Sequence, residues 1–339
     1  MPSVPGDSSL AAAPSSGTVL EVRDLSVEYL LEQGTVMAVD QVSFDLAAGE
    51  FLGIVGESGC GKSTLLFAIA QLLAPPAEIT GGSVVFKGRN MVGLTDKEMT
   101  AVRWKDLSVV MQSAMNALNP VKSIGAQFSD AMRAHGVASK GEIAERSAEV
   151  LKMVGIDPVH LKSYPHQLSG GMRQRSMIAM AMLFTPDLVI MDEPTSALDV
   201  VAQRSLMVQI KELQERLDFA IIFVTHDMSL VRHFSDRLIV MYAGVIAEFG
   251  PTGQVFDSPQ HPYSIGLMEA FPSIRGPRVP LTGIPGSPPN LARIPPGCRF
   301  APRCPKVMAR CEVEPPGLYQ VDGTLVRCFL HDEQGLSHD

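Results

Sequence analysis

The stretch Gly56-Glu57-Ser58-Gly59-Cys60-Gly61-Lys62-Ser63-Thr64 decides the fold. It follows a short apolar run at residues 51–55, and a helix-forming segment at residues 65–73 comes directly after it. A strand, a loop of the form G-x-x-x-x-G-K-[ST] and a helix, in that order, are typical of a phosphate-binding loop (P-loop). The glycines let backbone N–H groups turn toward phosphate oxygens, and the helix N-terminus adds partial positive charge. The sequence therefore predicts a nucleotide site.

Within this loop, Lys62 and Ser63 carry the expected chemistry. We expect the Lys62 ammonium to reach the β- and γ-phosphates of ATP, and the Ser63 hydroxyl to bind Mg²⁺. Cys60 is interpreted either as a small filler or as a redox-sensitive thiol, since helix N-termini stabilise thiolates. The loop residues expected to contact the nucleotide are Gly56, Ser58, Gly59, Cys60, Gly61, Lys62, Ser63 and Thr64.

Short apolar runs that end in polar or glycine-rich turns predict the central sheet. An alternating pattern over residues 19–44 favours two antiparallel strands around the turn at residues 32–34. A hairpin closed at residues 243–244 is expected at the end of this core. The buried strands expected in a parallel sheet are residues 51–55, 107–111, 188–191 and 221–225.

The remaining segments predict the domain organisation. No strand pattern appears between Ser113 and Arg175, so that stretch is expected to be a helical insertion with a helix near residues 141–154. Proline and glycine become frequent after about Ser264. We therefore predict an α/β P-loop NTPase core with an antiparallel β subdomain, an inserted helical subdomain and an irregular, cysteine-containing C-terminal extension. The expected boundaries are a disordered tail at 1–18, a nucleotide-binding domain at 19–263 with its helical subdomain at about 113–176, and the extension at 264–339.

Two carboxylates close the apolar run at residues 188–191, namely Asp192 and Glu193. Alternation along a strand places neighbouring side chains on opposite faces, which suits two different tasks. We expect Asp192 to bind Mg²⁺ together with Ser63, and Glu193 to polarise the water that attacks the γ-phosphate.

An LSGG stretch, Leu168-Ser169-Gly170-Gly171, precedes these carboxylates and resembles the signature of ABC (ATP-binding-cassette) ATPases. The other markers of that family occur along the chain in the order typical of the family. One difference is that Met172 stands where many members have Gln. The resemblance covers residues 19 to about 262. It implies that Ser169, Gly170 and Gly171 cap the γ-phosphate of ATP held by a partner subunit. It also implies a Q-loop at Gln112 that contacts Mg²⁺, a D-loop at residues 196–199, a switch histidine at His226 and an adenine-stacking aromatic at Tyr29.

Several segments resemble the oligopeptide/dipeptide importer branch of this family, among them residues 112–120, 261–264, 284–289 and 297–304. The resemblance implies an ATPase subunit that powers uptake of di- and oligopeptides. It also implies a second, related but non-identical ATPase subunit, two integral-membrane permease subunits and an extracytoplasmic substrate-binding protein. Gln112 and the helical insertion would receive a permease helix. The chain would then sit at the cytoplasmic face of the membrane, held there by the permeases.

Four cysteines gather in the extension, with intervals of five, six and sixteen residues between them. Their spacing lacks the paired C-x-x-C of a zinc ribbon, whereas four thiolates from a loop suit an iron–sulfur cluster. The resemblance implies a [4Fe-4S] cluster in some members of the branch. Zinc, free thiols and disulfides remain alternatives. An arginine adjoins each cysteine and is expected to lower the thiol pKa. These cysteines are Cys298, Cys304, Cys311 and Cys328.

Composition argues against some other functions. The net charge of −8 disfavours nucleic-acid binding, and no apolar run is long enough to span a bilayer. Two alternatives stay open: a soluble ABC ATPase acting on nucleic acid or ribosomes, and a regulatory cassette that does not hydrolyse ATP. The second would be expected to lack Glu193, His226 or Ser169, and the sequence has all three.

Overall fold

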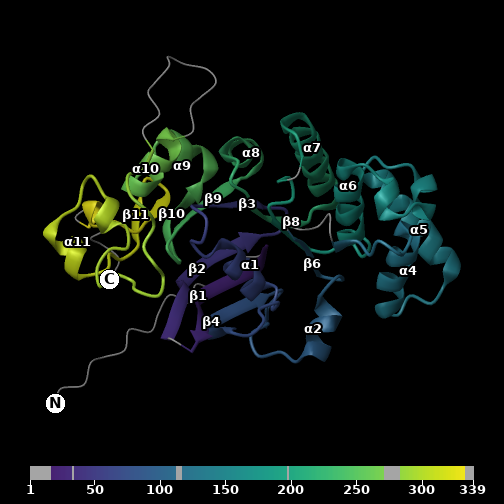
Figure 1. Ribbon diagram of the computed structural model, residues 1–339, viewed down its shortest axis with the longest axis horizontal. Helices are drawn as coiled ribbons and strands as arrows, with labels where there is room; N and C mark the ends of the chain where they lie inside the picture. Colours follow the sequence, from purple (N-terminus) through teal and green to yellow (C-terminus); the bar gives the residue numbers. More distant parts are fainter. Residues whose placement is uncertain (1–16, 33, 112–116, 197, 271–282, 333–339) are drawn as a thin grey trace.

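The computed structural model describes residues 17–32, 34–111, 117–196, 198–270 and 283–332. They form two sheets flanked by helices, with α4 and α5 at one end of the molecule and the segment around α11 at the other (Figure 1). The strands are β1 (Thr18–Leu31), β2 (Gly34–Ala47), β3 (Phe51–Val55), β4 (Ala77–Phe86), β5 (Arg89–Asn90), β6 (Leu107–Val110), β7 (Leu188–Asp192), β8 (Ala220–Val224), β9 (Arg237–Tyr242), β10 (Val245–Pro251), β11 (Tyr319–Val321) and β12 (Thr324–Val326). The α-helices are α1 (Lys62–Ile69), α2 (Asp96–Val102), α4 (Ile124–Ala134), α5 (Lys140–Met153), α6 (Gly170–Ala181), α7 (Val200–Leu217), α8 (Met228–Phe234), α9 (Thr252–Asp257), α10 (Pro262–Glu269) and α11 (Ala309–Val313), and the 3-10 helices are η1 (Pro158–Lys162), η2 (Pro165–Gln167), η3 (Ala301–Arg303) and η4 (Phe329–His331).

The larger sheet has the strand order β11-β12-β10-β9-β3-β8-β7-β6. Strands β9, β3, β8, β7 and β6 run parallel, and every residue of β3, β7 and β8 is buried. The four predicted apolar runs are therefore confirmed as buried parallel strands. The helix predicted at residues 65–73 is wrong in its bounds. It begins at Lys62, directly after the left-handed Gly61, and ends at Ile69, just before Gln71 adopts a left-handed φ of 54°.

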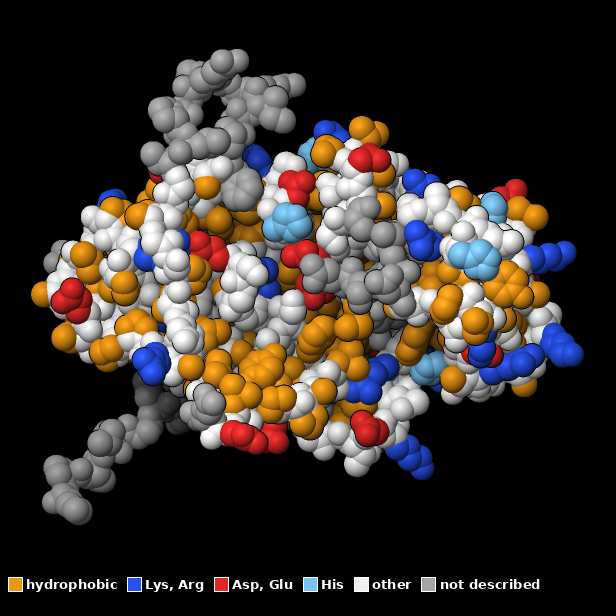
Figure 2. Space-filling model, viewed as in Figure 1, with side chains coloured by type: hydrophobic (Ala, Val, Ile, Leu, Met, Phe, Trp, Pro, Cys, Tyr) orange, Lys and Arg blue, Asp and Glu red, His pale blue; other side chains and the backbone are white. Residues whose placement is uncertain are grey.

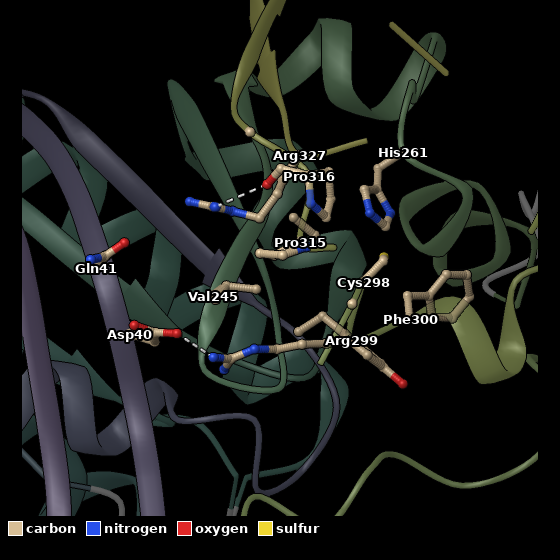
Figure 3. Close-up of a pocket in the computed structure, with 14 residues that line it drawn as sticks. Asp40, Gln41, Val245, His261, Cys298, Arg299, Phe300, Pro315, Pro316 and Arg327 are labelled. Atoms are coloured by element: carbon tan, nitrogen blue, oxygen red, sulfur yellow. Dashed lines mark hydrogen bonds and ion pairs between the residues drawn. The ribbon is translucent and has the colours of Figure 1, made fainter. Parts of the chain in front are cut away.

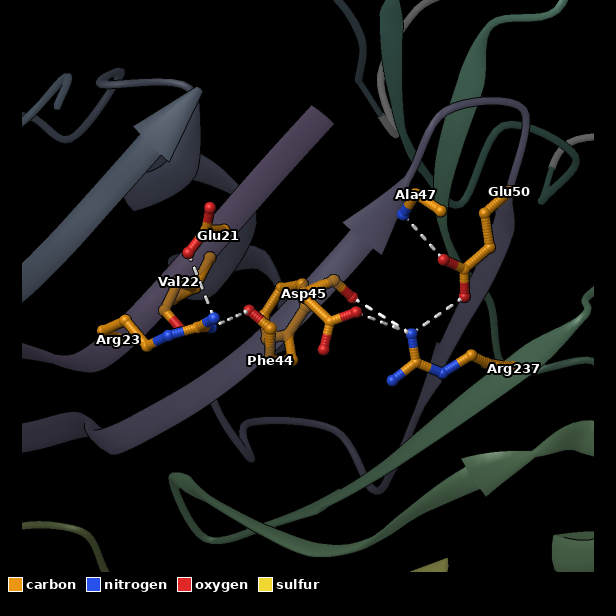
Figure 4. A network of polar contacts seen from close by, with 8 residues as sticks. All are labelled: Glu21, Val22, Arg23, Phe44, Asp45, Ala47, Glu50 and Arg237. Carbon is orange, nitrogen blue, oxygen red and sulfur yellow. Dashed lines mark hydrogen bonds and ion pairs between the residues drawn. The ribbon is translucent and has the colours of Figure 1, made fainter. Parts of the chain in front are cut away.

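The smaller sheet is antiparallel, with the strand order β2-β1-β4-β5. Its β1–β2 hairpin, in which Leu31 lies opposite Gly34, confirms the predicted turn. Arg237 of β9 fastens this sheet to the larger one (Figure 4). Its Nη1 atom donates to Asp45 Oδ2 and to Glu50 Oε1, both at 3.2 Å, and its guanidinium lies 4.2 Å from the centre of the Phe249 ring. The edge of the antiparallel sheet is thereby held close to the start of β3, where the P-loop strand begins.

The helical segment between β6 and β7 contains α4, α5, η1, η2 and α6. Among its described residues, 117–175, no strand occurs, as predicted, and α5 covers the helix expected at 141–154. Serine side chains cap the N-termini of the three α-helices: Ser123, Ser139 and Ser169 each accept a backbone N–H. Ser108 of β6 donates to Ala181 O at 2.8 Å, which ties α6 to the edge of the larger sheet.

The C-terminal extension is less irregular than predicted. Its β11–β12 hairpin continues the larger sheet, because β12 pairs with β10 through Glu248 and Val326. Its buried clusters are small: Ala301 with Cys311 and Phe329, and Val321 with Val326 and Cys328. The boundary expected between residues 263 and 264 lies inside α10. The tail expected at 1–18 falls mostly outside the described residues. No helix in the described ranges is both long and apolar enough to cross a membrane.

Candidate nucleotide-binding site

The P-loop lies at the carboxyl end of β3 and feeds directly into α1. Gly56, Gly59 and Gly61 have positive φ angles, and a Cβ at Gly61 would lie 2.2 Å from Ala38 O. Only glycine fits this backbone path, because both the left-handed conformation and the close approach exclude a side chain. The Lys62 ammonium donates to Gly56 O at 2.7 Å and to Glu57 O at 2.9 Å, so it lies inside the loop, where phosphates are expected to bind.

One cleft brings most of the predicted site residues together. It is open to solvent and lies over the N-terminus of α1, where backbone N–H groups and the helix dipole favour an anion. The P-loop, the end of β7 and the turn after β8 all contribute to its walls. The residues that line it are Tyr29, Val36, Ala38, Gly56, Ser58, Gly59, Gly61, Lys62, Ser63, Thr64, Glu193, His226 and Leu291.

The two carboxylates at the end of β7 have separate partners. Asp192 is buried and accepts a hydrogen bond from Ser63. Burial raises the pKa of Asp192, while the Ser63 hydrogen bond and the Lys62 charge lower it. Glu193 has a left-handed φ of 46°, and its Oε1 lies 3.4 Å from Nδ1 of His226. A buried carboxylate beside a hydroxyl provides oxygen donors suited to Mg²⁺, and a carboxylate beside an imidazole suits activation of water.

Tyr29 also lines the cleft, and its hydroxyl is 3.1 Å from Thr64 Oγ1. The three signature residues lie elsewhere. Ser169 caps α6 by accepting a hydrogen bond from Met172 N at 3.3 Å, and Gly170 and Gly171 form the first turn of that helix. None of the three is among the described residues that line the P-loop cleft. The signature residues and the P-loop cleft are therefore separate parts of the described structure. Gln112 lies outside the described residues.

Two family models of transport proteins match this chain. One, described as "ABC transporter", matches residues 39–196, and one described as "Oligopeptide/dipeptide transporter, C-terminal region" matches residues 247–311. The chain is 45% identical over 320 residues to the dipeptide transport ATP-binding protein DppD of Bacillus subtilis, covering 93% of this chain and 96% of that protein. It is 44% identical over 325 residues to the oligopeptide transport ATP-binding protein OppD of Salmonella typhimurium, covering 95% and 97%.

The chain belongs to the ABC transporter family. It is an ATP-binding, ATP-hydrolysing subunit of the oligopeptide/dipeptide branch. A dimeric structure of the ATP-binding cassette MJ0796 bound to ADP and Pi is 29% identical, with a TM-score of 0.62, and the match covers 69% of this chain and 98% of that one. A cassette of the ABC transporter complex cbiONQ from Clostridium perfringens, cbiO1, has the same fold, with a TM-score of 0.63 at 28% identity, and the match covers 72% of this chain and 92% of that one. A model described as "AAA domain, putative AbiEii toxin, Type IV TA system" matches only residues 161–232.

The pKa values of several thiols in this ABC subunit differ from those expected from the adjoining arginines. All five cysteines are free. Cys60 is buried, and burial raises its pKa, which favours the filler interpretation over a reactive thiolate. Burial also raises the pKa values of Cys298 and Cys304, and that of Cys328 to about 11. For these three extension cysteines, the prediction that an adjoining arginine lowers the thiol pKa is wrong.

The reason is that these arginine side chains reach other partners. Arg299 pairs with Asp40 of β2, and Arg327 donates to Pro316 O at 3.3 Å (Figure 3). Arg310 pairs with Glu314 and Asp332 at the surface. The four extension cysteines nevertheless line one small cavity together with Phe300 and other apolar side chains. Within the ranges that the structure describes, no three His, Cys, Asp or Glu side chains are arranged to hold a single metal ion.

Three residues from the C-terminal part of the chain reach this site, and none of them was assigned to it from the sequence. Leu291 of the extension lines the nucleotide cleft, and Arg303, also of the extension, contacts Glu57 of the P-loop. Tyr263 of α10 accepts a hydrogen bond from Glu57 N at 3.0 Å. No local pattern marks these contacts, since Glu57 and Arg303 are 246 residues apart in the chain. The extension therefore reaches the nucleotide site directly.

Proposed function

We propose that this subunit powers the uptake of di- and oligopeptides by hydrolysing ATP in the P-loop cleft. The observation that carries this proposal is the convergence of Lys62, Ser63, Glu193 and His226 on one cleft. Lys62 binds the phosphates, and Ser63, Asp192 and Gln112 hold Mg²⁺, which neutralises phosphate charge when bound. Glu193 takes a proton from the attacking water, and His226 orients Glu193 and contacts the γ-phosphate. Tyr29 stacks on the adenine.

The site is completed by a second ATPase subunit, whose own signature contacts the γ-phosphate. The position of Ser169, Gly170 and Gly171 outside the P-loop cleft supports this head-to-tail arrangement. Val200 and Val201 follow the D-loop and are 77% and 80% exposed, as expected for apolar residues that a partner covers. Our proposal takes this partner to be a related, non-identical chain.

The remaining partners are two permeases and an extracytoplasmic substrate-binding protein. The subunit is peripheral at the cytoplasmic face of the membrane, where Gln112 and the helical segment receive a permease helix. The matching relatives carry the names dipeptide and oligopeptide transport ATP-binding protein. Lys and Arg side chains on the face shown in Figure 2 are interspersed with acidic and apolar ones, which does not suit nucleic-acid binding. The proposed domain limits are 19–263 and 264–339, with residues 1–18 as a tail.

The substitution Glu193→Gln tests the catalytic assignment. It should lower the ATP hydrolysis rate by about 10²- to 10⁴-fold, because the general base is lost, while ATP binding is kept. Steady-state hydrolysis by the full importer in lipid vesicles, with uptake of labelled di- and oligopeptides, provides the measurement. Glu215→Gln, which neutralises an exposed carboxylate on α7, is the matched control and should act like the wild type. Full hydrolysis by Glu193→Gln, or hydrolysis without peptide uptake by the wild-type importer, would refute the proposal.

We further propose that Cys298, Cys304, Cys311 and Cys328 hold a [4Fe-4S] cluster that cross-links the extension. The proposal is supported by the four thiols lining one small apolar cavity, although no three of the described His, Cys, Asp or Glu side chains are arranged to hold a metal ion. A cluster spreads its four thiolates around a cube of iron and sulfide, whereas zinc needs four ligands around one ion. Anaerobic purification should give about four iron and about four sulfide per chain. Cys304→Ser should lose most of both, and Cys60→Ser should lose neither. Zinc without sulfide would exclude the cluster.

A further inference from the structure

Arg303 joins the cysteine-bearing loop to the P-loop. It lies at the end of η3, directly before Cys304, and its guanidinium forms a two-pronged ion pair with Glu57. The Nη1 atom lies 2.7 Å from Glu57 Oε2, and the Nη2 atom lies 2.9 Å from Glu57 Oε1. A bidentate arginine–carboxylate pair fixes both distance and orientation, so it transmits a movement of one loop to the other.

The surroundings of Arg303 make this pair difficult to replace. Its side chain is only 5% exposed, and it also donates to Pro285 O at 2.8 Å and to Tyr242 Oη at 3.2 Å. All three nitrogen atoms of the guanidinium therefore have partners. Removing Glu57 would leave the buried Arg303 charge without its ion-pair partner, which is far more costly than losing an exposed ion pair. Removing Arg303 would leave Glu57, whose side chain is 27% exposed, without this partner.

Two further sets of contacts connect the P-loop to the surroundings of the cysteine-bearing loop. The hydroxyl of Tyr263 accepts the Glu57 N–H, and the Tyr263 ring packs against Phe300, which lies between Cys298 and Cys304 in the chain. Arg299 donates to Ala243 O, and the next residue, Gly244, donates its N–H to Cys60 O at 2.8 Å. The loop of residues 298–304 therefore contacts the P-loop directly at Glu57 and is linked to Cys60 through Ala243 and Gly244.

From these contacts we infer that Arg303 is a positioning residue for ATP binding, and that the pair Glu57–Arg303 couples the cysteine-bearing loop to the nucleotide site. An ordered loop at residues 298–304 holds the P-loop in the conformation that accepts phosphates. By thermodynamic reciprocity, bound ATP must protect the same loop against opening, by the same factor. This inference rests on the proposed function only in that ATP binds at the P-loop.

The first test measures ATP affinity of the full chain with a fluorescent ATP analogue and Mg²⁺. Arg303→Gln should weaken binding about tenfold, within the usual range of coupling between two sites. Arg303→Lys should bind with intermediate affinity, because it keeps the charge and loses the bidentate geometry. Arg310→Gln is the matched control. Arg310 also adjoins a cysteine, but its ion pairs are with Glu314 and Asp332, both within the extension, so the ATP affinity should not change. The double variant Glu57→Gln/Arg303→Gln should be no weaker than the worse single variant.

The second test uses reciprocity and does not depend on hydrolysis. Hydrogen–deuterium exchange labelling of the backbone amides of residues 298–304, measured by mass spectrometry under anaerobic conditions, reports opening of the loop whether or not its cysteines hold a cluster. ATP should slow labelling about tenfold in the wild type and in Arg310→Gln, and should have little effect in Arg303→Gln. Lys62→Ala tests the proposed nucleotide site separately from the proposed coupling. It should abolish ATP binding whether or not Glu57 and Arg303 couple the two loops. Wild-type affinity in Arg303→Gln, or equal ATP protection in Arg303→Gln and Arg310→Gln, would overturn the inference. If Arg303→Gln does not fold, Arg303→Lys and Glu57→Gln give the same comparison.

Discussion

The centre of the larger sheet and the C-terminal extension are stabilised in different ways. Strands β3, β7 and β8 bury every one of their residues, whereas the extension has two buried clusters of three residues each. A fully buried Val, Ile, Leu or Phe side chain contributes about 1.5–3 kcal/mol through removal from water. The sheet is therefore stable through apolar burial, and the extension depends on attachments to it.

Beside the buried Phe300, which belongs to the main apolar core, many of those attachments are polar and long-range. Arg299 reaches Asp40, Arg303 reaches Glu57, and Arg327 N donates to Ala247 O at 2.9 Å beside the β10–β12 pairing. Each joins the extension to the nucleotide-binding part rather than to itself. The difference indicates that a segment with too little core of its own can still be ordered, provided that its charged side chains find buried partners elsewhere.

The largest effect is expected for a truncation in the central sheet. Phe223 of β8 is fully buried and packs edge-to-face on Phe51, with ring centroids 5.9 Å apart. Phe223→Ala should lower the free energy of unfolding by about 3–5 kcal/mol, because it removes packing and leaves a cavity. Urea unfolding of the full chain, followed by circular dichroism, measures the loss. Phe223→Leu keeps most of the volume and should cost clearly less.

The matching truncation in the extension is Phe329→Ala. Phe329 belongs to a three-residue cluster, and the Arg310 guanidinium lies 4.0 Å from its ring centre. This variant should open the extension locally, seen as faster hydrogen–deuterium exchange of residues 309–313, and leave the main unfolding transition of the sheet nearly unchanged. Equal losses in the two alanine variants would mean that both regions unfold as one unit, and the comparison would fail.

The sequence was most informative where one local pattern determines structure. Short apolar runs ending in charged or glycine-rich turns predicted β3, β6, β7 and β8, and the P-loop motif predicted the position of Lys62 at the start of a helix. Asp192 and Glu193 were assigned to separate tasks from strand alternation alone, and the structure gives them separate partners. Burial and phosphate binding leave direct marks on composition, so these features could be found without a structure.

The sequence was least informative where the backbone or a long side chain departs from a pattern. β4 was missed because Gly81-Gly82 interrupts its apolar alternation. The strand continues through this point with a register shift, where a Cβ at Gly82 would lie 2.4 Å from Arg23 O. The arginines beside the cysteines were expected to lower the pKa values of the nearest thiols. A guanidinium can reach several ångströms from its backbone, and those of Arg299 and Arg303 pair instead with carboxylates that are distant in sequence.

A smaller, pH-dependent loss of stability should show whether the neutral imidazole of His261 contributes to the attachment of α10. His261 is buried, and burial lowers its pKa to about 3. Its Nδ1 atom accepts the N–H of Tyr263 at 3.0 Å, which positions the tyrosine that contacts Glu57. Because the folded pKa is below the ordinary value of about 6.5, this histidine contributes full stability above about pH 6.5 and loses it as the pH falls. Between pH 6.5 and pH 5.0 the loss should be about 2 kcal/mol.

His261→Asn isolates this contribution, since the amide oxygen can still accept the Tyr263 N–H but cannot be protonated in this range. Urea unfolding of the wild type and of His261→Asn is measured across pH 7.5 to 5.0. The difference between the two proteins cancels the effect of the other histidines, which both contain. Glu248 accepts the N–H groups of Gln260 and His261, and burial raises its pKa, so its own contribution changes with pH in the opposite sense and is also common to both. The wild type should therefore lose about 2 kcal/mol more than the variant on acidification. Parallel pH profiles would show that His261 is protonated without cost, and that α10 is attached through Glu248 rather than through the neutral imidazole.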